Sequence, residues 1–374
     1  MYRILFVNWR DIRNPEAGGA EVHLHEISRR IATHGHRVTV LASSFKGSTA
    51  EEEIDGVRVV RCGGKFTFNF HVPGAIKKLE RREAFDVIID DINKIPFYTP
   101  LYIRKPLLAL AHHLFGHTIF LETIPPLALY VLLSELMIPV VYKRTRLVVV
   151  SESTKEELVK RGLPAENIGI VYNAVDHSRY TPSGEAKPSR PLIGYVGRIK
   201  RYKRIDYLLR ALQIVQARIP EVRLKVAGSG DYLDSLVVLA GRLGIEDRVD
   251  FMGFVSEQEK IDMLREAQVV VNPSSKEGWG VTVIEANACG TPVIASDVPG
   301  LRDAVVDGET GFLVSYGDVE GFAARIIQVL EDGSLRKRLS DRGVEWAGKF
   351  NWDNSADAML KAIDGVVRGV KSTQ

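Results

Sequence analysis

The segment Asn272-Pro-Ser-Ser-Lys-Glu-Gly-Trp-Gly-Val-Thr-Val-Ile-Glu-Ala286 is the strongest indication of the fold of this 374-residue chain. It begins where a short apolar run, residues 269–271, ends, and it leads into a stretch with helical spacing. A buried strand that passes through a glycine turn into a helix is the building unit of parallel α/β sheets. Gly278 and Gly280 allow the backbone to turn closely, and the N–H groups that follow are exposed at the helix start, where an anion can bind. These N–H groups belong to Val281, Thr282 and Val283.

Two carboxylates bracket this glycine turn. Glu277 lies at the mouth of the loop, and Glu285 lies about two turns into the predicted helix. Both can bind ligands that are rich in hydroxyl groups. The alternative is that Glu277 is only a helix N-terminal charge and that Glu285 is a buried carboxylate satisfied by its neighbours. Two carboxylates around one glycine turn favour a binding site.

The same strand-and-helix pattern occurs throughout the chain, in two series. Because the apolar runs are continuous and do not alternate with polar residues, they predict parallel strands that are covered on both faces. A polar, proline-rich stretch, residues 181–191, separates the two series and predicts a linker. We therefore expect an α/β protein of two doubly wound Rossmann-like domains that face each other across a cleft, with ligands at the carboxyl ends of the strands. The runs are 4–7, 38–41, 57–60, 87–89, 107–111 and 147–150, and then 192–196, 224–227, 249–251, 269–271 and 293–295.

The composition fits this class and excludes several others. Hydrophobic residues make up 45% of the chain and charged residues 26%, as in a soluble folded protein. With 50 basic and 47 acidic residues the net charge is +3, so no basic excess indicates a nucleic-acid partner. Two distant cysteines, Cys62 and Cys289, predict neither a disulfide scaffold nor a zinc site and fit a reducing cytoplasm. The apolar run at the N-terminus is too short for a signal peptide and predicts a first strand.

Two cations follow the first strand of the second series. Arg198 and Lys203 lie just beyond residues 192–196, at the end of the strand where ligands bind. Fixed cations there suit a diphosphate leaving group. The alternative is a solvated basic loop, since Lys200, Arg201 and Arg204 are close by.

A glycine pair follows the first strand of the first series. Gly18 and Gly19 stand where a loop becomes a helix, so that N–H groups and the helix dipole can meet an anion or sugar hydroxyls. A tight turn with no ligand is the alternative, and the pair alone does not decide between them.

These features together resemble retaining glycosyltransferases of family 4, the group 1 glycosyltransferases with the two-Rossmann-domain GT-B fold. The segment from Glu277 to Glu285 is similar to the Glu-x7-Glu motif of that family. The resemblance covers nearly the whole chain, and it depends on the order and spacing of the motifs. The further matching segments are 18–21, 34–38, 149–153, 171–176, 197–203, 290–296 and 307–311.

The resemblance implies transfer of a sugar from a UDP- or GDP-sugar to a hydroxyl acceptor, with retention of anomeric configuration. It assigns Arg198 and Lys203 to the donor diphosphate, Glu277 to hydroxyls of the donor sugar and Glu285 to the ribose hydroxyls. The remaining expected donor-binding residues are Gly197, Gly228, Gly230, Phe254, Gly278, Trp279, Gly280, Val281, Thr282 and Val283.

The resemblance also implies an active-site histidine after the strand at 107–111. His112 is the candidate and His113 is the second choice. Gly18, Gly19, His113 and Asn173 are expected to form the acceptor or phosphate loop. Trp279 stands where the family more often has Phe, and Ala174 where it usually has glycine, which affects the expected substrate more than the reaction.

The implied domains are residues 1–183 for the acceptor and residues 184–354 for the donor. Residues 355–374 form a last helix that the family packs back on the first domain. The expected reaction takes place on one face of the sugar, and the leaving phosphate oxygen accepts the proton of the acceptor hydroxyl. We expect no metal or other cofactor, since Asp90-Asp91 only approaches an Asp-x-Asp motif and the histidines 112, 113 and 117 have no acidic partner at the right spacing. A nucleotide-sugar epimerase of the same fold and a catalytically silent nucleotide-sugar-binding module are the alternatives.

Residues 124–142 are the most apolar part of the chain. Prolines and Glu135 argue against a membrane-spanning helix, so a buried helix of the first domain is the first expectation. The alternative is an interfacial patch, because two basic clusters accompany this run. That alternative implies a lipid-linked acceptor, as in cell-envelope glycan or glycolipid synthesis, and peripheral contact with an anionic membrane at the inner face of the cell membrane. The clusters are Lys143, Arg144 and Arg146, and Lys77, Lys78, Arg81 and Arg82.

Overall fold

The structure is a computed structural model that describes residues 1–93, 95–184, 187 and 189–371. The chain divides into two compact units. Unit 1 contains residues 1–119, 124–173 and the chain from Trp352 on, and unit 2 contains residues 120–123 and 174–351. The division between Asn173 and Ala174 precedes the boundary expected after residue 183 by ten residues. The linker predicted at residues 181–191 includes residues 185, 186 and 188, which lie outside the described residues.

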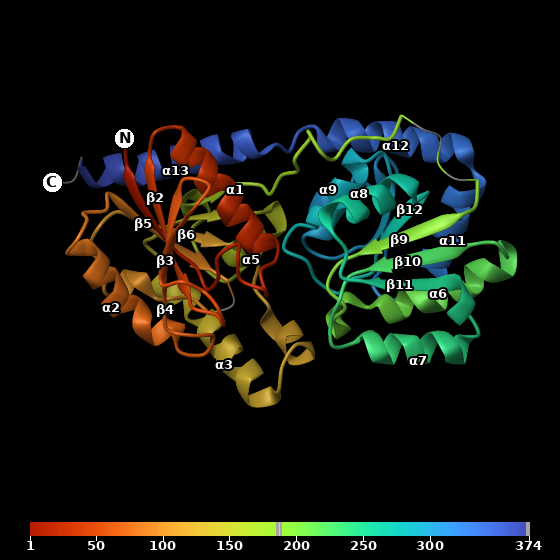
Figure 1. Ribbon diagram of the computed structural model, residues 1–374, viewed down its shortest axis with the longest axis horizontal. Helices are drawn as coiled ribbons and strands as arrows, with labels where there is room; N and C mark the ends of the chain where they lie inside the picture. The colour runs from red at the N-terminus through yellow and green to blue at the C-terminus, as the bar shows by residue number, and fades with distance from the viewer. Residues whose placement is uncertain (94, 185–186, 188, 372–374) are drawn as a thin grey trace. The chain divides into compact units, whose positions relative to one another are not determined.

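Unit 1 is built on one twisted sheet (Figure 1). Among the described residues eight strands pair in the order β3-β4-β2-β1-β5-β6-β7-β8, parallel except for β3 with β4. The central strands are apolar and buried, because helices cover both faces. The strands are β1 (Arg3–Val7), β2 (Arg37–Ser43), β3 (Glu51–Ile54), β4 (Val57–Cys62), β5 (Val87–Ile92), β6 (Leu107–Ala111), β7 (Arg146–Val149) and β8 (Ile168–Ile170). The helices are α1 (Gly19–Thr33), α2 (Phe68–Glu80), α3 (Pro125–Leu136), α4 (Ile138–Val141), α5 (Glu152–Lys160) and α13 (Trp352–Lys371).

Unit 2 has a second, wholly parallel sheet (Figure 1). In the described part of the chain its order is β11-β10-β9-β12-β13-β14, so the order reverses between β9 and β12. The predicted α/β class with two Rossmann-like domains is therefore confirmed. The strands are β9 (Leu192–Val196), β10 (Arg223–Ala227), β11 (Val249–Gly253), β12 (Val269–Asn272), β13 (Val293–Ser296) and β14 (Gly311–Val314). The helices are α6 (Ile205–Arg218), α7 (Leu233–Leu243), α8 (Glu257–Glu266), α9 (Val281–Ala288), α10 (Leu301–Ala304), α11 (Val319–Glu331) and α12 (Gly333–Ala347).

The last helix, α13, belongs to unit 1 and packs beside α1. Its buried stripe includes Met359 and Ile363, which covers one face of the sheet with α1. Two polar contacts fix its start: the Arg30 guanidinium lies 2.7 Å from the Asp353 carboxylate, and the Ser355 hydroxyl donates to the carbonyl of Tyr172 at 2.8 Å. The predicted return of this helix to the first domain is confirmed.

Helix α3 corrects the first expectation for residues 124–142. The buried-helix interpretation is wrong, because only a narrow stripe of α3 faces the unit and the rest of its apolar surface is exposed. Glu135, whose charge argued against a membrane-spanning helix, is buried. Its carboxylate accepts hydrogen bonds from the N–H groups of Phe115 and Gly116 at 2.6 and 2.8 Å, which compensate its burial. No described helix is both long and apolar enough to cross a membrane. The exposed apolar residues are Ile124, Leu127, Leu129, Tyr130, Leu133, Leu136, Met137 and Val140.

Candidate functional site

The loops after β9 and β12 flank the point where the strand order of unit 2 reverses. Ligands of open parallel sheets bind outside the strand ends at such a point. The backbone N–H and the hydroxyl of Ser275 donate to the carbonyl of Tyr202 at 2.9 and 3.0 Å, which ties the two loops together. Glu277 and the predicted cations Arg198 and Lys203 are therefore on two segments that contact each other.

Two glycines set the approach of the neighbouring backbone. A Cβ atom at Gly228 would lie 1.9 Å from the carbonyl oxygen of Gly197, and one at Gly230 would lie 2.1 Å from that of Ile199. The N–H of Ile199 donates to the carbonyl of Ser229 at 2.8 Å across this contact. Gly228 and Gly230 are thus required for packing the loops after β9 and β10, and the predicted Gly197 supplies the carbonyl that Gly228 approaches.

Lys203 and Glu277 form an ion pair through the lysine Nζ and Oε1 of the carboxylate. The Ser274 hydroxyl also lies 2.8 Å from this Oε1, so both contacts are made by the same oxygen. The side chains are 12% and 15% exposed. Burial disfavours the ammonium, but Glu277 together with Tyr202 and Tyr195 outweighs burial and raises the pKa of Lys203 above its ordinary value. The pair keeps a fixed cation next to a carboxylate whose second oxygen has no hydrogen bond or ion pair within the described part of the chain.

Arg198 lies on the same loop, and its side chain is exposed. Among the described residues no ion pair or hydrogen bond occupies its guanidinium, unlike that of its neighbour Lys200, which pairs with Asp231 at 2.6 Å. An accessible guanidinium can make two parallel hydrogen bonds to a phosphate.

Glu285 on α9 has its own lysine, which sequence reasoning missed. Lys260 on α8 places its Nζ 3.0 Å from Glu285 Oε1. The second oxygen, Oε2, is buried and has no hydrogen-bond partner within the described residues. Lys260 gave no signal in the sequence, because it stands among charged residues that resemble a solvated helix face.

The start of α9 is shaped by Gly280, whose φ of +83° lies in the left-handed region that favours glycine. Val281 and Thr282 are partly exposed there, whereas Val283 is buried. A Cβ atom at Gly300 would lie 2.2 Å from the carbonyl oxygen of Glu277, so this glycine supports the loop as well.

Two of the predicted donor residues differ sharply in exposure. Phe254, directly after β11, is 87% exposed and open to stacking. Trp279 is buried, and its ring meets that of Phe350 edge to face at 4.7 Å between centroids. The Trp279 side chain therefore packs in the interior of unit 2, between Gly278, which is partly exposed, and Gly280.

In unit 1 the glycine loop leads into α1. The N–H of Gly18 donates to Glu21 Oε2 at 2.7 Å, and Asn93 donates to Oε1 at 3.0 Å. Burial raises the pKa of Glu21. Gly19 is exposed at the first position of the helix.

His112 follows β6 and lies against Asp91 of β5. The distance from His112 Nε2 to Asp91 Oδ1 is 3.0 Å, an ion pair without an aligned hydrogen bond. Burial lowers the pKa of His112, but Asp91 outweighs burial and raises it overall. His23 meets His112 edge to face at 5.1 Å, and burial keeps the pKa of His23 well below its ordinary value. The expectation that these histidines lack an acidic neighbour is wrong, because β5 and β6 pair in parallel and end side by side.

The other two candidates of unit 1 are less informative. The His113 ring packs on Phe115 at 4.5 Å between centroids. Asn173 is buried at the end of the unit. No group of three or more His, Cys, Asp or Glu side chains that could hold a metal occurs in the described ranges.

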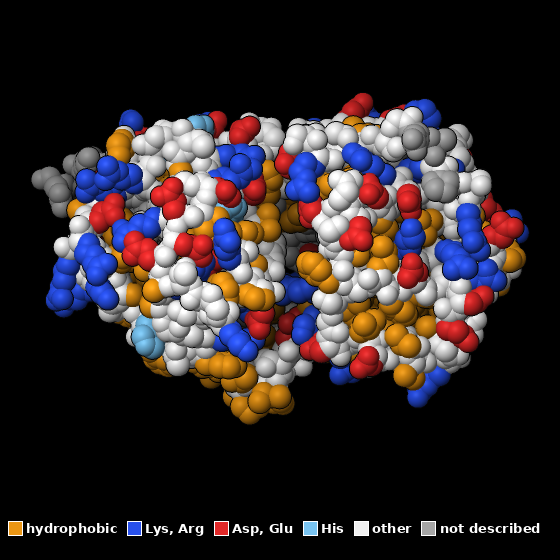
Figure 2. Space-filling model, in the orientation of Figure 1, with side chains coloured by type: hydrophobic (Ala, Val, Ile, Leu, Met, Phe, Trp, Pro, Cys, Tyr) orange, Lys and Arg blue, Asp and Glu red, His pale blue; other side chains and the backbone are white. Residues whose placement is uncertain are grey.

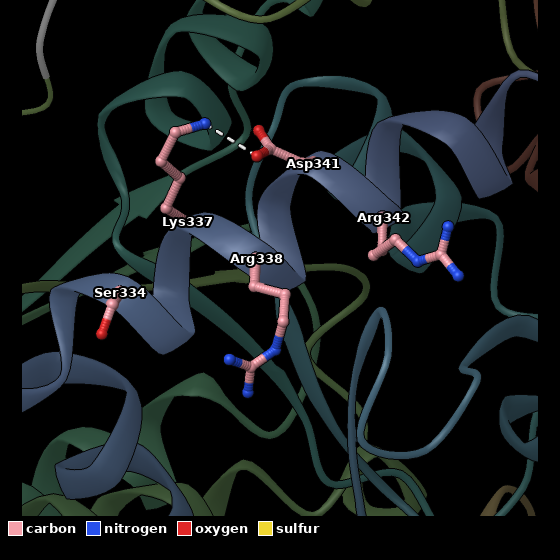
Figure 3. A pocket seen from close by; sticks show the side chains of 5 residues that line it. All are labelled: Ser334, Lys337, Arg338, Asp341 and Arg342. Atoms are coloured by element: carbon pink, nitrogen blue, oxygen red, sulfur yellow. Dashed lines mark hydrogen bonds and ion pairs between the residues drawn. The ribbon is translucent and has the colours of Figure 1, made fainter.

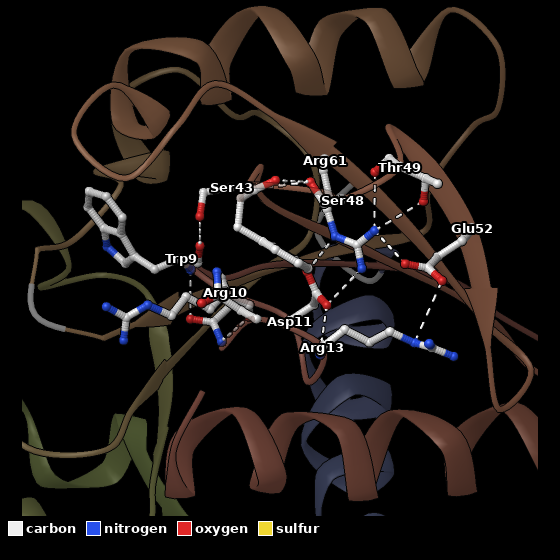
Figure 4. A network of polar contacts seen from close by, with 12 residues as sticks. Trp9, Arg10, Asp11, Arg13, Ser43, Ser48, Thr49, Glu52 and Arg61 are labelled. Carbon is white, nitrogen blue, oxygen red and sulfur yellow. Dashed lines mark hydrogen bonds and ion pairs between the residues drawn. The ribbon is translucent and has the colours of Figure 1, made fainter. Parts of the chain in front are cut away.

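The loop after β1 is held by a closed ion-pair network (Figure 4). The buried Arg61 guanidinium of β4 binds both oxygens of Asp11, at 2.7 and 2.8 Å. Its third nitrogen lies 2.5 Å from Glu52 and 3.1 Å from the carbonyl of Thr49. This network fixes the loop that precedes Gly18 and Gly19.

Helix α12 of unit 2 carries a shallow hollow (Figure 3). It is lined by side chains of one helix face, and Lys337 pairs with Asp341 there at 2.7 Å. No residue of the motifs described above lines it. The lining residues are Ser334, Lys337, Arg338, Asp341 and Arg342.

Comparison with known proteins gives consistent results for both halves of the chain. The profile described as Glycosyl transferases group 1 matches residues 178–346, and that described as Glycosyltransferase Family 4 matches residues 17–179. The D-inositol 3-phosphate glycosyltransferase of Mycolicibacterium smegmatis is 38% identical over 236 residues, which are 59% of this chain and 53% of that protein. The chain thus spans about half the length of the curated relatives it matches.

Solved structures share the fold over the whole chain. The sucrose-phosphate synthase of Thermosynechococcus elongatus has a TM-score of 0.82 at 22% identity and covers 100% of both chains. Alr3699/HepE of Anabaena, solved in complex with UDP and glucose, has a TM-score of 0.77 at 20% identity and covers 98% of this chain and 100% of its own. At these identities the likeness concerns the fold alone.

Proposed function

The chain belongs to the group 1 glycosyltransferases with the GT-B fold, and from this premise we propose that it transfers a sugar from a nucleotide-sugar donor to a hydroxyl acceptor with retention of configuration. The observation that carries the proposal is the arrangement of Lys203, Glu277 and Arg198 at the strand ends of unit 2. Both charges needed for a sugar diphosphate are present: cations for the phosphates and a carboxylate for hydroxyls.

Each residue has one role in the proposed reaction. The diphosphate binds Arg198 and Lys203, and a donor-sugar hydroxyl donates to the free oxygen of Glu277. The acceptor oxygen attacks the anomeric carbon on the face that the leaving group departs from. The bond from that carbon to the phosphate oxygen breaks, the diphosphate leaves with the electron pair, and its oxygen takes the acceptor proton. Arg198 and Lys203 stabilise the charge that develops, so that the protein supplies this stabilisation with its own residues.

We assign the donor to unit 2 and the acceptor to unit 1, where His112 lies in the sheet end next to the glycine loop. UDP and GDP sugars are the proposed donors. Two observations support a nucleoside diphosphate: the exposed ring of Phe254, on which a base can stack, and the UDP held by the HepE protein of similar fold.

We propose that the acceptor is a lipid-linked hydroxyl at an anionic membrane surface. Peripheral contact of unit 1 with this surface would bring the acceptor within reach. Apolar side chains gather over α3 at the lower edge of unit 1 (Figure 2). Leu129, Leu133, Leu136 and Val140 follow helical spacing on one face and are 50–68% exposed. Such a face beside cations is typical of helices that lie in the membrane interface.

Cations accompany this apolar face. Helices α2 and α4 pack on the same side of the sheet. Phe68 of α2 shares a core cluster with Ile88 of β5, and Ile138 of α4 shares another with Ile92 of β5. Because side chains alternate along a strand, Ile88 and Ile92 lie on the same face of the sheet. The exposed cations of α2 and of the loop after α4 form no ion pair among the described residues, and each contributes about 1 kcal/mol at an anionic surface. They are Lys77, Lys78, Arg81, Arg82, Lys143 and Arg144.

The donor is tested by thermal shift with UDP, GDP and ADP, followed by transfer assays with the corresponding glucose and mannose donors. We expect stabilisation by UDP or GDP and retention of the anomeric configuration in the product. Inositol 3-phosphate, the substrate in the name of the mycobacterial relative, is assayed beside a polyprenyl-phosphate-linked sugar. Absence of transfer from every donor contradicts the proposal, and interconversion of the donor sugar would indicate an epimerase.

The membrane contact is tested by co-sedimentation with phosphatidylglycerol and phosphatidylcholine vesicles at low salt. We expect binding to the anionic vesicles, which Leu133→Glu/Val140→Glu abolishes. The matched control is Val237→Glu/Val238→Glu, on exposed apolar residues of α7 in unit 2. Equal binding of both double variants contradicts the docking surface, and a change in oligomeric state without vesicle binding would make it a contact between copies of the chain.

A further inference from the structure

The lysine beside Glu285 has no role in the reaction outlined above, although it is as buried as Lys203. Lys260 lies on α8, where its side chain is 17% exposed, and Glu285 lies on α9, where its side chain is 10% exposed. The inference below rests on the proposed nucleotide-sugar donor and concerns how that donor's nucleoside is held.

Three groups surround the Lys260 ammonium. Its Nζ lies 3.0 Å from Glu285 Oε1, 3.2 Å from Glu257 Oε2 and 5.1 Å from the centroid of the Tyr180 ring. The Tyr180 hydroxyl donates to the other oxygen of Glu257. The lysine is therefore fixed from α9, from its own helix and from the loop that carries Tyr180.

The charges of this cluster agree with the geometry. Burial lowers the pKa of Lys260, but Glu285 and Glu257 outweigh burial and raise it. Lys260 is therefore an ammonium at neutral pH, and it can donate to both carboxylates at once.

Glu285 retains one oxygen that accepts no hydrogen bond from the described residues. Oε1 accepts from Lys260, whereas Oε2 is buried with no hydrogen-bond partner in the described part of the chain. A buried acceptor left without a partner destabilises the protein, so a ligand hydroxyl that donates to it recovers this penalty.

We propose that Lys260 is a positioning residue that holds Glu285 by Oε1, so that Oε2 accepts a hydrogen bond from a ribose hydroxyl of the bound nucleoside diphosphate. Glu257 and Tyr180 restrain Lys260, and Lys260 restrains Glu285. The carboxylate is thus oriented before the nucleotide arrives, and less conformational freedom is lost on binding. Lys260 itself does not touch the nucleotide.

Calorimetric titration of the full chain with UDP and 2′,3′-dideoxy-UDP tests this role, and the same pair of guanosine compounds serves if GDP binds more tightly. In the wild type we expect the ribonucleotide to bind about tenfold more tightly, which is the value of one good hydrogen bond to a charged group. Lys260→Met should reduce this preference to about twofold, because it weakens the binding of the ribonucleotide and not that of the dideoxy analogue. Lys260→Arg, which keeps two donors, should retain most of it.

Steady-state kinetics separate positioning from catalysis. Lys260→Met should raise the KM for the donor about tenfold and leave kcat within about twofold, because the interaction is the same in the ground state and the transition state. The matched control is Lys225→Met, which removes another lysine of unit 2 that pairs with a glutamate, Glu266, at 2.7 Å. It should change neither the ribose preference nor the KM.

Two results overturn the inference: an unchanged ribose preference in Lys260→Met, or an equal loss of affinity for both analogues, which indicates a merely structural role. If Lys260→Met does not fold, Glu257→Gln takes its place. Loss of that restraint should reduce the preference about threefold, and an unchanged preference also overturns the inference. Wild-type protein that binds no nucleotide overturns the proposed function as well, whereas wild-type binding without ribose preference overturns only the role of Lys260.

Discussion

Asp11 of unit 1 and Glu285 of unit 2 are both buried carboxylates beside a cation, but they differ in what remains free. Both oxygens of Asp11 accept hydrogen bonds from Arg61, and one also accepts from the N–H of Arg13 at 2.9 Å. Glu285 uses one oxygen for Lys260, and its other oxygen is buried without a hydrogen-bond partner among the described residues. We call an ion pair closed when both carboxylate oxygens are occupied and open when one is not. A closed pair can only support the fold, whereas an open pair can still accept a hydrogen bond from a ligand. Glu277 with Lys203 follows the open pattern.

The largest effect on stability should come from removing Asp11, the carboxylate of the closed ion pair. Asp11→Ala leaves the fully buried Arg61 guanidinium with Glu52 and Thr49 only, and should lower the free energy of unfolding by about 3 kcal/mol. Urea denaturation measures this loss. Glu16→Ala removes the exposed carboxylate that pairs with Arg10 and Lys65 and should cost less than about 1 kcal/mol. A similar small cost for Asp11→Ala would mean that the closed network does not support the fold.

The open pair at Glu277 should affect the activity. Glu277→Gln and Lys203→Met should each lower kcat by about a hundredfold, because both act on the same transition state. The kcat of the double variant should be no lower than that of the less active single variant. Losses that multiply in the double variant would indicate that the two side chains act independently.

A smaller effect is expected at the ion pair of unit 1. Asp91 raises the pKa of His112, so the pair stabilises the fold below about pH 6.5 and this contribution is lost as the pH rises through the raised value. The stability difference between wild type and Asp91→Asn should therefore be larger at about pH 6 than at about pH 8. Urea denaturation at both values measures it, and Glu21 and His23, which also face His112, are unchanged in the variant.

The smallest effect, none, is expected from chelation. Since Arg198 and Lys203 supply the positive charge that a metal would bring, EDTA should leave the rate of transfer unchanged. Recovery of a lost rate by Mg²⁺ or Mn²⁺ would show that the basic pair does not replace a metal.

The part of the site that the sequence predicts is the part encoded in single segments. The continuous apolar runs predict strands covered on both faces, and the glycine turn between Glu277 and Glu285 predicts a strand end next to a helix start. Both follow from local rules. Asp91 beside His112 was also predictable, since each stands at the end of one of two neighbouring parallel strands.

Other parts depend on tertiary packing. Lys260 lies on a helix whose sequence is that of a solvated surface, and only the packing of α8 near α9 brings it to Glu285. Residues 124–142 are apolar on all sides, so hydrophobicity alone indicated burial there. The sheet can cover only one stripe of α3, which includes Ala128 and Val131, and the rest stays exposed.

The sharpest test is nucleotide release from UDP-glucose and GDP-mannose, measured with the wild-type chain, Lys203→Met and Lys225→Met. The claim is that the ion pair of Lys203 and Glu277 in unit 2 is required for sugar transfer. It predicts release by the wild type in the presence of acceptor, an unchanged rate in Lys225→Met and a loss of about a hundredfold in Lys203→Met. Equal rates in all three proteins, or no release from either donor, would contradict it.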